Sequence, residues 1–98
     1  MPDRVLDELS ALRDAITERI ARVGDGRLAL ADALRPADGD DPDALASRFV
    51  YAVKVAEAAP GVGKVRARRA LGAVGLGERD RVGDLAPDVR SALLRELA

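Results

Sequence analysis

The sequence predicts an all-α fold, a small helical domain with an amphipathic helix at its N-terminus. Apolar residues recur at spacings of three and four in the first and last segments, as they do on one face of a helix. Glycine and proline stand where these segments start or stop. The 98 residues suffice for one domain, which we divide into an N-terminal helix or arm at 1–24 and a domain at 25–98.

The first predicted helix carries an apolar stripe and ends at glycine. Its stripe consists of Val5, Leu9, Leu12, Ile16 and Val23, widened by Leu6 and Ile20. Gly24 and Gly26 are expected to end this helix. The helix either lies on its own domain or forms an arm, over residues 1–22, that binds a partner protein or a second copy of the chain.

A short second helix is predicted at 27–35, followed by a polar turn. Pro36 ends the helix, and Asp41 or Asp43 can cap the next one, with Pro42 in its first turn. The segment 43–59 fits either a helix or a strand, because it contains the β-branched and aromatic run FVYAVKV. Its alanines and its length favour one continuous helix.

The chain has two aromatic residues, and both lie in that segment. We expect Phe49 in the core. Tyr51 is either a partly buried helix residue or a residue that stacks on a base or sugar.

A glycine-containing turn at 60–64 (PGVGK) leads into a helix predicted at 63–74, and a loop with one possible helical turn follows at 75–84. A last helix starts near Pro87. The expected inward residues are Val65, Leu71 and Val74 in the first of these helices and Val89, Leu93, Leu94 and Leu97 in the second.

The composition lowers the expectation of an enzyme. Cysteine and histidine are absent, so disulfides, thiol ligands and the usual proton shuttle are excluded. The acidic cluster at 38–43 lacks the closing glutamate of a calcium loop, since the next glutamate is Glu57. We therefore expect no catalytic residues, no cofactor and no metal. With no signal peptide and no long apolar run, we expect a soluble cytoplasmic protein.

The formal net charge of -1 hides two halves of opposite sign. Residues 1–46 hold six arginines and eleven acidic residues, whereas residues 47–98 hold ten basic and six acidic residues. A basic half of this kind indicates a polyanionic partner.

The turn at 60–64 is the strongest candidate for that contact. Gly61 and Gly63 can adopt positive φ and allow close approach of another molecule. The amide groups of the following helix point at the same place, where the helix dipole favours an anion such as phosphate. The candidate DNA-binding residues are Gly61, Val62, Gly63, Lys64, Arg66, Arg68, Arg69 and Arg81. Contacts from Lys64 and three arginines predict a salt slope of roughly −3 to −4.

Two nucleotide-binding motifs do not fit this turn. A Walker A sequence needs glycine where Ala58 stands and a hydroxyl where Val65 stands. The dinucleotide fingerprint needs a third glycine where the chain has Arg66. A helix, a Gly-apolar-Gly hairpin and a second helix remain; the same pattern also fits a plain helical corner with solvated arginines.

PGVGKVRAR at 60–68 resembles the helix-hairpin-helix element of the actinobacterial integration host factor family. ITERIARV at 16–23 and RLALADALR at 27–35 are similar to the family's N-terminal and short second helices, and VRSALLREL at 89–97 is similar to its last helix. The resemblance covers most of residues 13–97. It implies a helix-two-turns-helix domain, related to that of a small-subunit ribosomal protein.

The resemblance also implies a function. Members of the family are cytoplasmic, nucleoid-associated proteins that bind double-stranded DNA with little sequence preference and influence its shape, compaction and recombination. The family's hairpin glycines and lysine correspond to Gly61, Gly63 and Lys64, and its next basic positions to Arg66 and Arg68. Its second basic stretch, of the type RRxRGLG, corresponds here to DRVGDLA at 80–86, which keeps only Arg81.

Two alternatives remain open. Asp80 and Asp84 stand in that second stretch, and the chain as a whole is not basic. A divergent relative with weak DNA affinity would then act as a protein–protein interaction module through its acidic half. RNA binding is the third reading, because the ribosomal relative of the fold binds RNA.

Overall fold

The computed structural model describes residues 4–98, with side chains from residue 6 onward, and confirms the all-α fold class. The helices are α1 (Arg4–Gly24), α2 (Leu30–Ala33), α3 (Pro42–Phe49), α4 (Ala52–Ala58), α5 (Gly63–Ala73) and α6 (Pro87–Leu97), with a 3-10 turn η1 (Val82–Asp84) before the last. No helix within residues 4–98 is both long and apolar enough to cross a membrane.

The core lies where α4, α5 and α6 meet the end of α1. Its largest fully buried side chains include Leu34, Leu71 and Leu93, each stabilising the fold by about 1.5–3 kcal/mol relative to an exposed position. Alanines fill much of the remaining core, which lets these short helices approach closely. The predicted inner face of α6 is confirmed, because Leu93 and Leu97 are buried while Val89 and Leu94 are partly buried.

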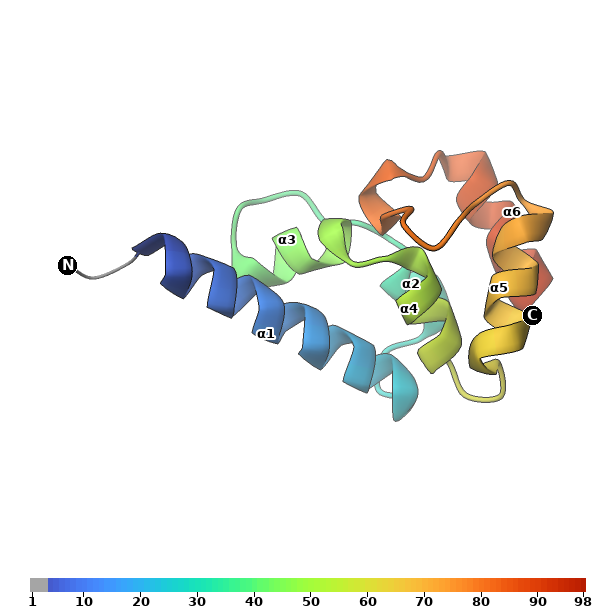
Figure 1. The fold of residues 1–98 in the computed structure, drawn as a ribbon, viewed down its shortest axis with the longest axis horizontal. Coiled ribbons are helices and arrows are strands. Elements are labelled where there is room, and N and C mark those ends of the chain that lie inside the picture. The colour runs from blue at the N-terminus through green and yellow to red at the C-terminus, as the bar shows by residue number, and fades with distance from the viewer. Residues whose placement is uncertain (1–3) are drawn as a thin grey trace.

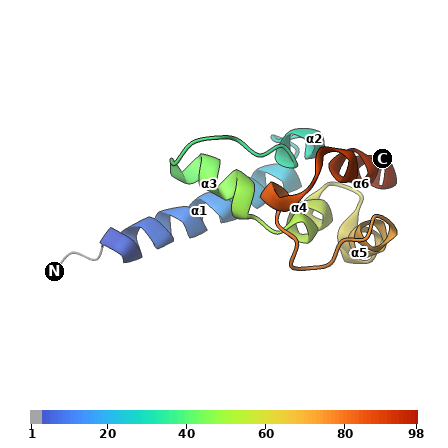
Figure 2. The same cartoon turned by 90° about the horizontal axis from the view of Figure 1, so that it is seen from above.

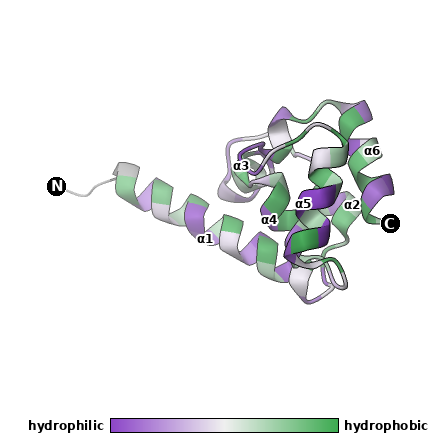
Figure 3. Ribbon diagram, turned by 45° about the vertical axis from the view of Figure 1, so that its right-hand side comes forward, coloured by the Kyte–Doolittle hydropathy of each residue, from purple (hydrophilic) through white to green (hydrophobic). Residues whose placement is uncertain are grey.

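The helix α1 extends beyond this core. Its C-terminal half packs against the core through Ile16, Ile20 and Val23. Its N-terminal half runs alongside α3 and away from α5 and α6 (Figures 1 and 2). Leu6 and Leu9 there are 60% and 53% exposed, so green apolar turns continue along the projecting part of the helix (Figure 3).

The second helix is shorter than predicted, because the residues before it cap α1 instead. The Leu28 amide donates to Arg22 O at 3.0 Å, and the Arg27 amide donates to Asp25 Oδ1 at 3.0 Å. Gly26 has φ 83°. These bonds hold residues 25–29 in a turn, so α2 keeps only its four residues Leu30–Ala33.

The prediction of one helix over 43–59 is wrong. The chain is capped as expected at its start, since Asp41 Oδ2 accepts from the Ala44 amide at 3.2 Å. It breaks at Val50 and Tyr51, which are both extended. Their backbone pairs with a later segment: Ala52 N donates to Asp80 O at 2.9 Å, and Val82 N donates to Val50 O at 3.0 Å.

This break explains why Phe49 is not a core residue. Side chains alternate along extended backbone, and Val50 takes the inward position with 1% of its surface exposed. Phe49, the last residue of α3, and Tyr51, the residue before α4, both point outward, with 41% and 36% exposed. The expectation of a buried Phe49 is wrong for that reason.

The helix α5 matches its predicted range within one residue, but Val65 is not inward. The buried face consists of Ala67, Ala70 and Leu71, which follows the three-and-four spacing of a helix. Val65 lies two residues before Ala67, about 200° around the axis, and is 70% exposed. The expected single helical turn within the loop at 75–84 is confirmed as η1.

Candidate nucleic-acid interface

The turn between α4 and α5 is open and depends on its glycines. Gly61 and Gly63 have φ of 81° and 74°, which confirms the expected left-handed backbone at these two positions. The Val62 amide closes the turn by donating to Ala59 O at 3.1 Å. A Cβ at either glycine would meet nothing within 4 Å, so glycine is required here by the backbone conformation and not by crowding. The same open space leaves the surface over the turn accessible to a ligand.

The helix α5 begins at this open turn without a side-chain cap. Val62 occupies the capping position and can accept no hydrogen bond through its side chain. The first turn of the helix contains no acidic residue. Its leading amides and dipole therefore leave a partial positive charge next to the exposed glycines.

Two of the predicted basic residues are free at this place. Lys64 and Arg69 are exposed, and their side chains form no hydrogen bond or ion pair with any residue in the range 4–98. Lys64 follows Gly63 directly, whereas Arg69 lies five residues beyond Lys64, about 7.5 Å further along α5 and about 140° around its axis. Neither has a carboxylate partner within residues 4–98, so both side chains can contact an anion from outside.

Arg68, in contrast, is held by two carboxylates. Its Nη1 donates to Glu57 Oε2 at 3.0 Å, and its Nε donates to Glu78. These bonds, from Glu78 first and then Glu57, raise the pKa of Arg68 above its ordinary value. Arg68 thus joins α5 to α4 and to the loop after α5, and its charge is largely neutralised within the protein.

Arg66 is also occupied. Its Nη2 donates to Leu97 O at 3.1 Å and to Ala98 O at 3.0 Å, and its Nη1 donates to Gly61 O at 3.4 Å. A guanidinium at the C-terminal end of a helix satisfies carbonyl groups that lack partners there. Arg66 therefore fixes the position of the turn relative to α6.

The structure does not bring Arg81 to the turn. Arg81 pairs with Tyr51, the residue that precedes α4, whereas the glycine turn follows the other end of α4. Seven residues of α4 separate the two places, about 10 Å at 1.5 Å per residue. The predicted site residues thus fall into a group at 61–69 and a single residue elsewhere.

Sequence reasoning missed Glu57 and Glu78 as partners of the basic residues. The pair Lys54–Glu57 is visible in the sequence as an i,i+3 spacing, and Lys54 Nζ lies 3.3 Å from Glu57 Oε1. Glu57 and Arg68 are 11 residues apart, so no local pattern reveals their contact. Residues 4–98 contain no cluster of three or more acidic side chains that could hold a metal ion.

Comparisons of this chain with protein families, with curated proteins and with solved structures each found no match.

Proposed function

We propose that this chain binds duplex DNA through phosphate contacts at the turn between α4 and α5, as an integration-host-factor-like, nucleoid-associated protein. One observation carries the proposal. The open turn Gly61–Gly63 lies at the uncapped start of α5, next to the free cation of Lys64, and a second free cation, Arg69, lies further along the same helix.

Each part of this arrangement suits a phosphate group. Glycines without side chains let the backbone approach closely, and the leading amides of α5 are donors without an internal acceptor. The helix dipole and two cations add attraction for a negative charge. Arg66 and Arg68 support the proposal indirectly, because their bonds to α6, α4 and the following loop hold the turn in place.

The same geometry limits how strongly the chain binds. Phosphate contacts position a protein but do not read the base sequence. With Lys64 and Arg69 as the free cations, we expect a salt slope near −2, at about −0.9 for each phosphate contact. This is smaller than the slope from four cations, because the structure engages Arg66 and Arg68 elsewhere.

The test is an anisotropy titration of labelled duplex DNA at several salt concentrations. We compare the native chain with Lys64→Glu and with Arg13→Glu, an equal charge change in the N-terminal half of α1, which runs away from α5 (Figure 1). Lys64→Glu should weaken binding and flatten the salt slope, whereas Arg13→Glu should change both far less. Equal affinity for all three chains would refute the proposal, and preferential binding of duplex RNA would replace DNA with RNA as the ligand.

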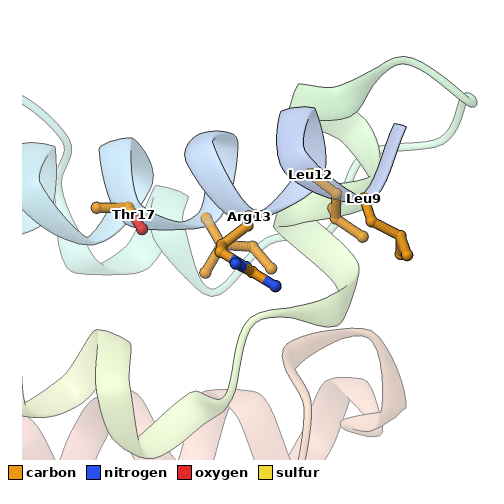
Figure 4. Close-up of a pocket in the computed structure, with 5 residues that line it drawn as sticks. Leu9, Leu12, Arg13 and Thr17 are labelled. Carbon is orange, nitrogen blue, oxygen red and sulfur yellow. The ribbon is translucent and has the colours of Figure 1, made fainter. Parts of the chain in front are cut away.

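The second candidate function is a protein–protein interaction module through α1. It is favoured by a shallow apolar surface along one side of this helix, lined by Leu9, Leu12, Arg13, Ile16 and Thr17. Figure 4 shows Leu9, Leu12 and Arg13 extending from the same side of α1. Measuring the mass in solution of the native chain and of Leu9→Glu tests this function, since a complex held by this surface would be lost in the variant.

A further inference from the structure

The segment 49–51 carries both aromatic residues of the chain, and both are exposed at the surface. Phe49 ends α3, and the backbone is extended at Val50 and Tyr51; Val50 is buried in the core, whereas Phe49 and Tyr51 are exposed. Phe49 and Tyr51 are 41% and 36% exposed. More than a third of each residue is therefore open to a ligand, while the rest is covered by the protein.

Arg81 lies over a face of each of the two rings and leaves their other faces to solvent or a ligand. Its guanidinium carbon lies 5.5 Å from the centroid of the Phe49 ring and 5.0 Å from that of the Tyr51 ring. Its Nη2 also donates to Tyr51 Oη at 3.4 Å. The two backbone hydrogen bonds between residues 50–52 and residues 80–82 hold the segments together, so the rings and the cation form a preset surface, which we call the aromatic platform (Phe49, Tyr51 and Arg81).

We propose that the aromatic platform stacks an unpaired nucleobase, with Arg81 placed to attract the phosphate of the same nucleotide. Exposed aromatic rings stack on bases without regard to sequence, and a neighbouring arginine adds cation–π and phosphate attraction. This pairing of π surface with one cation matches the two parts of a nucleotide, a flat base and an anion.

The inference rests on the proposed function in one respect, because the glycine turn would hold the backbone of the same strand. The platform and the turn are separated by α4, about 10 Å long. A strand with the rise of duplex DNA, about 3.4 Å per nucleotide, covers this distance in roughly three nucleotides, and a more extended unpaired strand needs no more. A single-stranded or locally unpaired segment that contacts both places is therefore short.

The chain carries its own reporter for this test. Tyr51 is the only tyrosine and there is no tryptophan, so the intrinsic tyrosine emission comes from the aromatic platform alone. We titrate the native chain at low salt with a short oligothymidylate and, separately, with inorganic polyphosphate. Stacking predicts quenching of the emission by oligothymidylate and little change with polyphosphate, which offers anions without bases.

Substitutions then distinguish the effect of the aromatic π surface from that of the apolar volume of the side chain. Phe49→Leu and Tyr51→Leu keep apolar side chains but remove the π surface, and each should weaken oligothymidylate binding about 5- to 150-fold. Binding of all variants is followed by the anisotropy of a labelled oligothymidylate, because the Tyr51 variants contain no tyrosine. Tyr51→Phe keeps the ring and should bind within about twofold of the native chain. Urea unfolding of each variant checks that it folds; should a leucine variant fail to fold, the quenching of the native chain still decides the question.

Two results would overturn the inference: oligothymidylate that leaves the tyrosine emission unchanged, or folded leucine variants that bind it as tightly as the native chain. If either result were found but duplex binding still depended on Lys64, the proposed function would remain intact. Platform-dependent binding of oligothymidylate together with no duplex binding would refute the proposed function alone.

Discussion

Arg68 Nη1 donates a hydrogen bond to Glu57 Oε2 at 3.0 Å and thereby joins the helix after the glycine turn to the helix before it. Glu57 is mostly covered, with 13% of its side chain exposed, whereas Glu78, the other partner of Arg68, is 64% exposed. Arg68, which the sequence predicts to bind DNA, is thus paired with two carboxylates of its own chain. These contacts set both the stability of the turn and the number of free cations around it.

Removing the exposed carboxylate should increase DNA binding. In Glu78→Gln, Arg68 keeps Glu57 but loses its second anionic partner, so its charge becomes available in part to a phosphate. We expect higher affinity for duplex DNA and a salt slope steeper by up to about one. Asp14→Asn makes the same charge change on an exposed position of α1 and should have a much smaller effect; equal gains in both variants would mean that net charge alone is responsible.

Glu57 should make stability depend on pH. Burial raises the pKa of Glu57, but hydrogen bonds from Arg68 and Lys54 lower it by more, so it lies below its ordinary value. A carboxylate with a lowered pKa stabilises the fold above the ordinary pKa of about 4.3 and loses that contribution as the pH falls through the lower, folded-state value.

Urea unfolding at about pH 6 and about pH 3 measures this contribution. The native chain should be more stable than Glu57→Gln at the higher pH, and the difference in the free energy of unfolding should shrink at the lower pH. A difference that stays constant between the two pH values would show that Glu57 acts through packing and not through its charge.

Glycine in the turn should be required for stability. Gly63 has φ 74°, a conformation that costs an alanine about 1–2 kcal/mol, so Gly63→Ala should lower the free energy of unfolding by that amount. Gly72, in the same helix, has open space and no positive φ. Gly72→Ala should therefore stabilise the chain by about 0.5–1 kcal/mol, and urea unfolding that gave both variants the same sign would contradict this explanation.

Ser47 should stabilise the connection before α3. Its hydroxyl donates to Ala44 O at 2.6 Å and accepts from the Ala37 amide at 2.8 Å, while the residue is 1% exposed. Ser47→Ala leaves the Ala37 amide without this partner and should cost about 1–3 kcal/mol in thermal or urea unfolding. Ser91→Ala, at an exposed position of α6, should change stability by no more than about 0.5 kcal/mol.

Local patterns predicted most of the helices correctly and failed where a distant segment intervened. The Asp41 cap, the start of the last helix at Pro87 and the glycine turn all depend on neighbouring residues, and all three were predicted. The break at Val50 depends on two backbone hydrogen bonds, from Ala52 N to Asp80 O and from Val82 N to Val50 O. The residues that these bonds join are 28 and 32 positions apart in the chain. The β-branched and aromatic run in this segment was the one available signal, and the alanines around it outweighed that signal.

By itself, the sequence determined the fold class, the glycine turn and the concentration of basic residues behind it, because backbone preferences, caps and charge counts act over a few neighbouring residues. Only the tertiary structure decided which of those basic residues remain free. The partners of Arg68 lie 11 and 10 residues away and those of Arg66 lie 31 and 32 residues away, and they meet only when α5 packs against α4 and α6. Whether an arginine faces solvent or a carboxylate depends on that packing, so Lys64 and Arg69 are free while Arg66 and Arg68 are held within the protein.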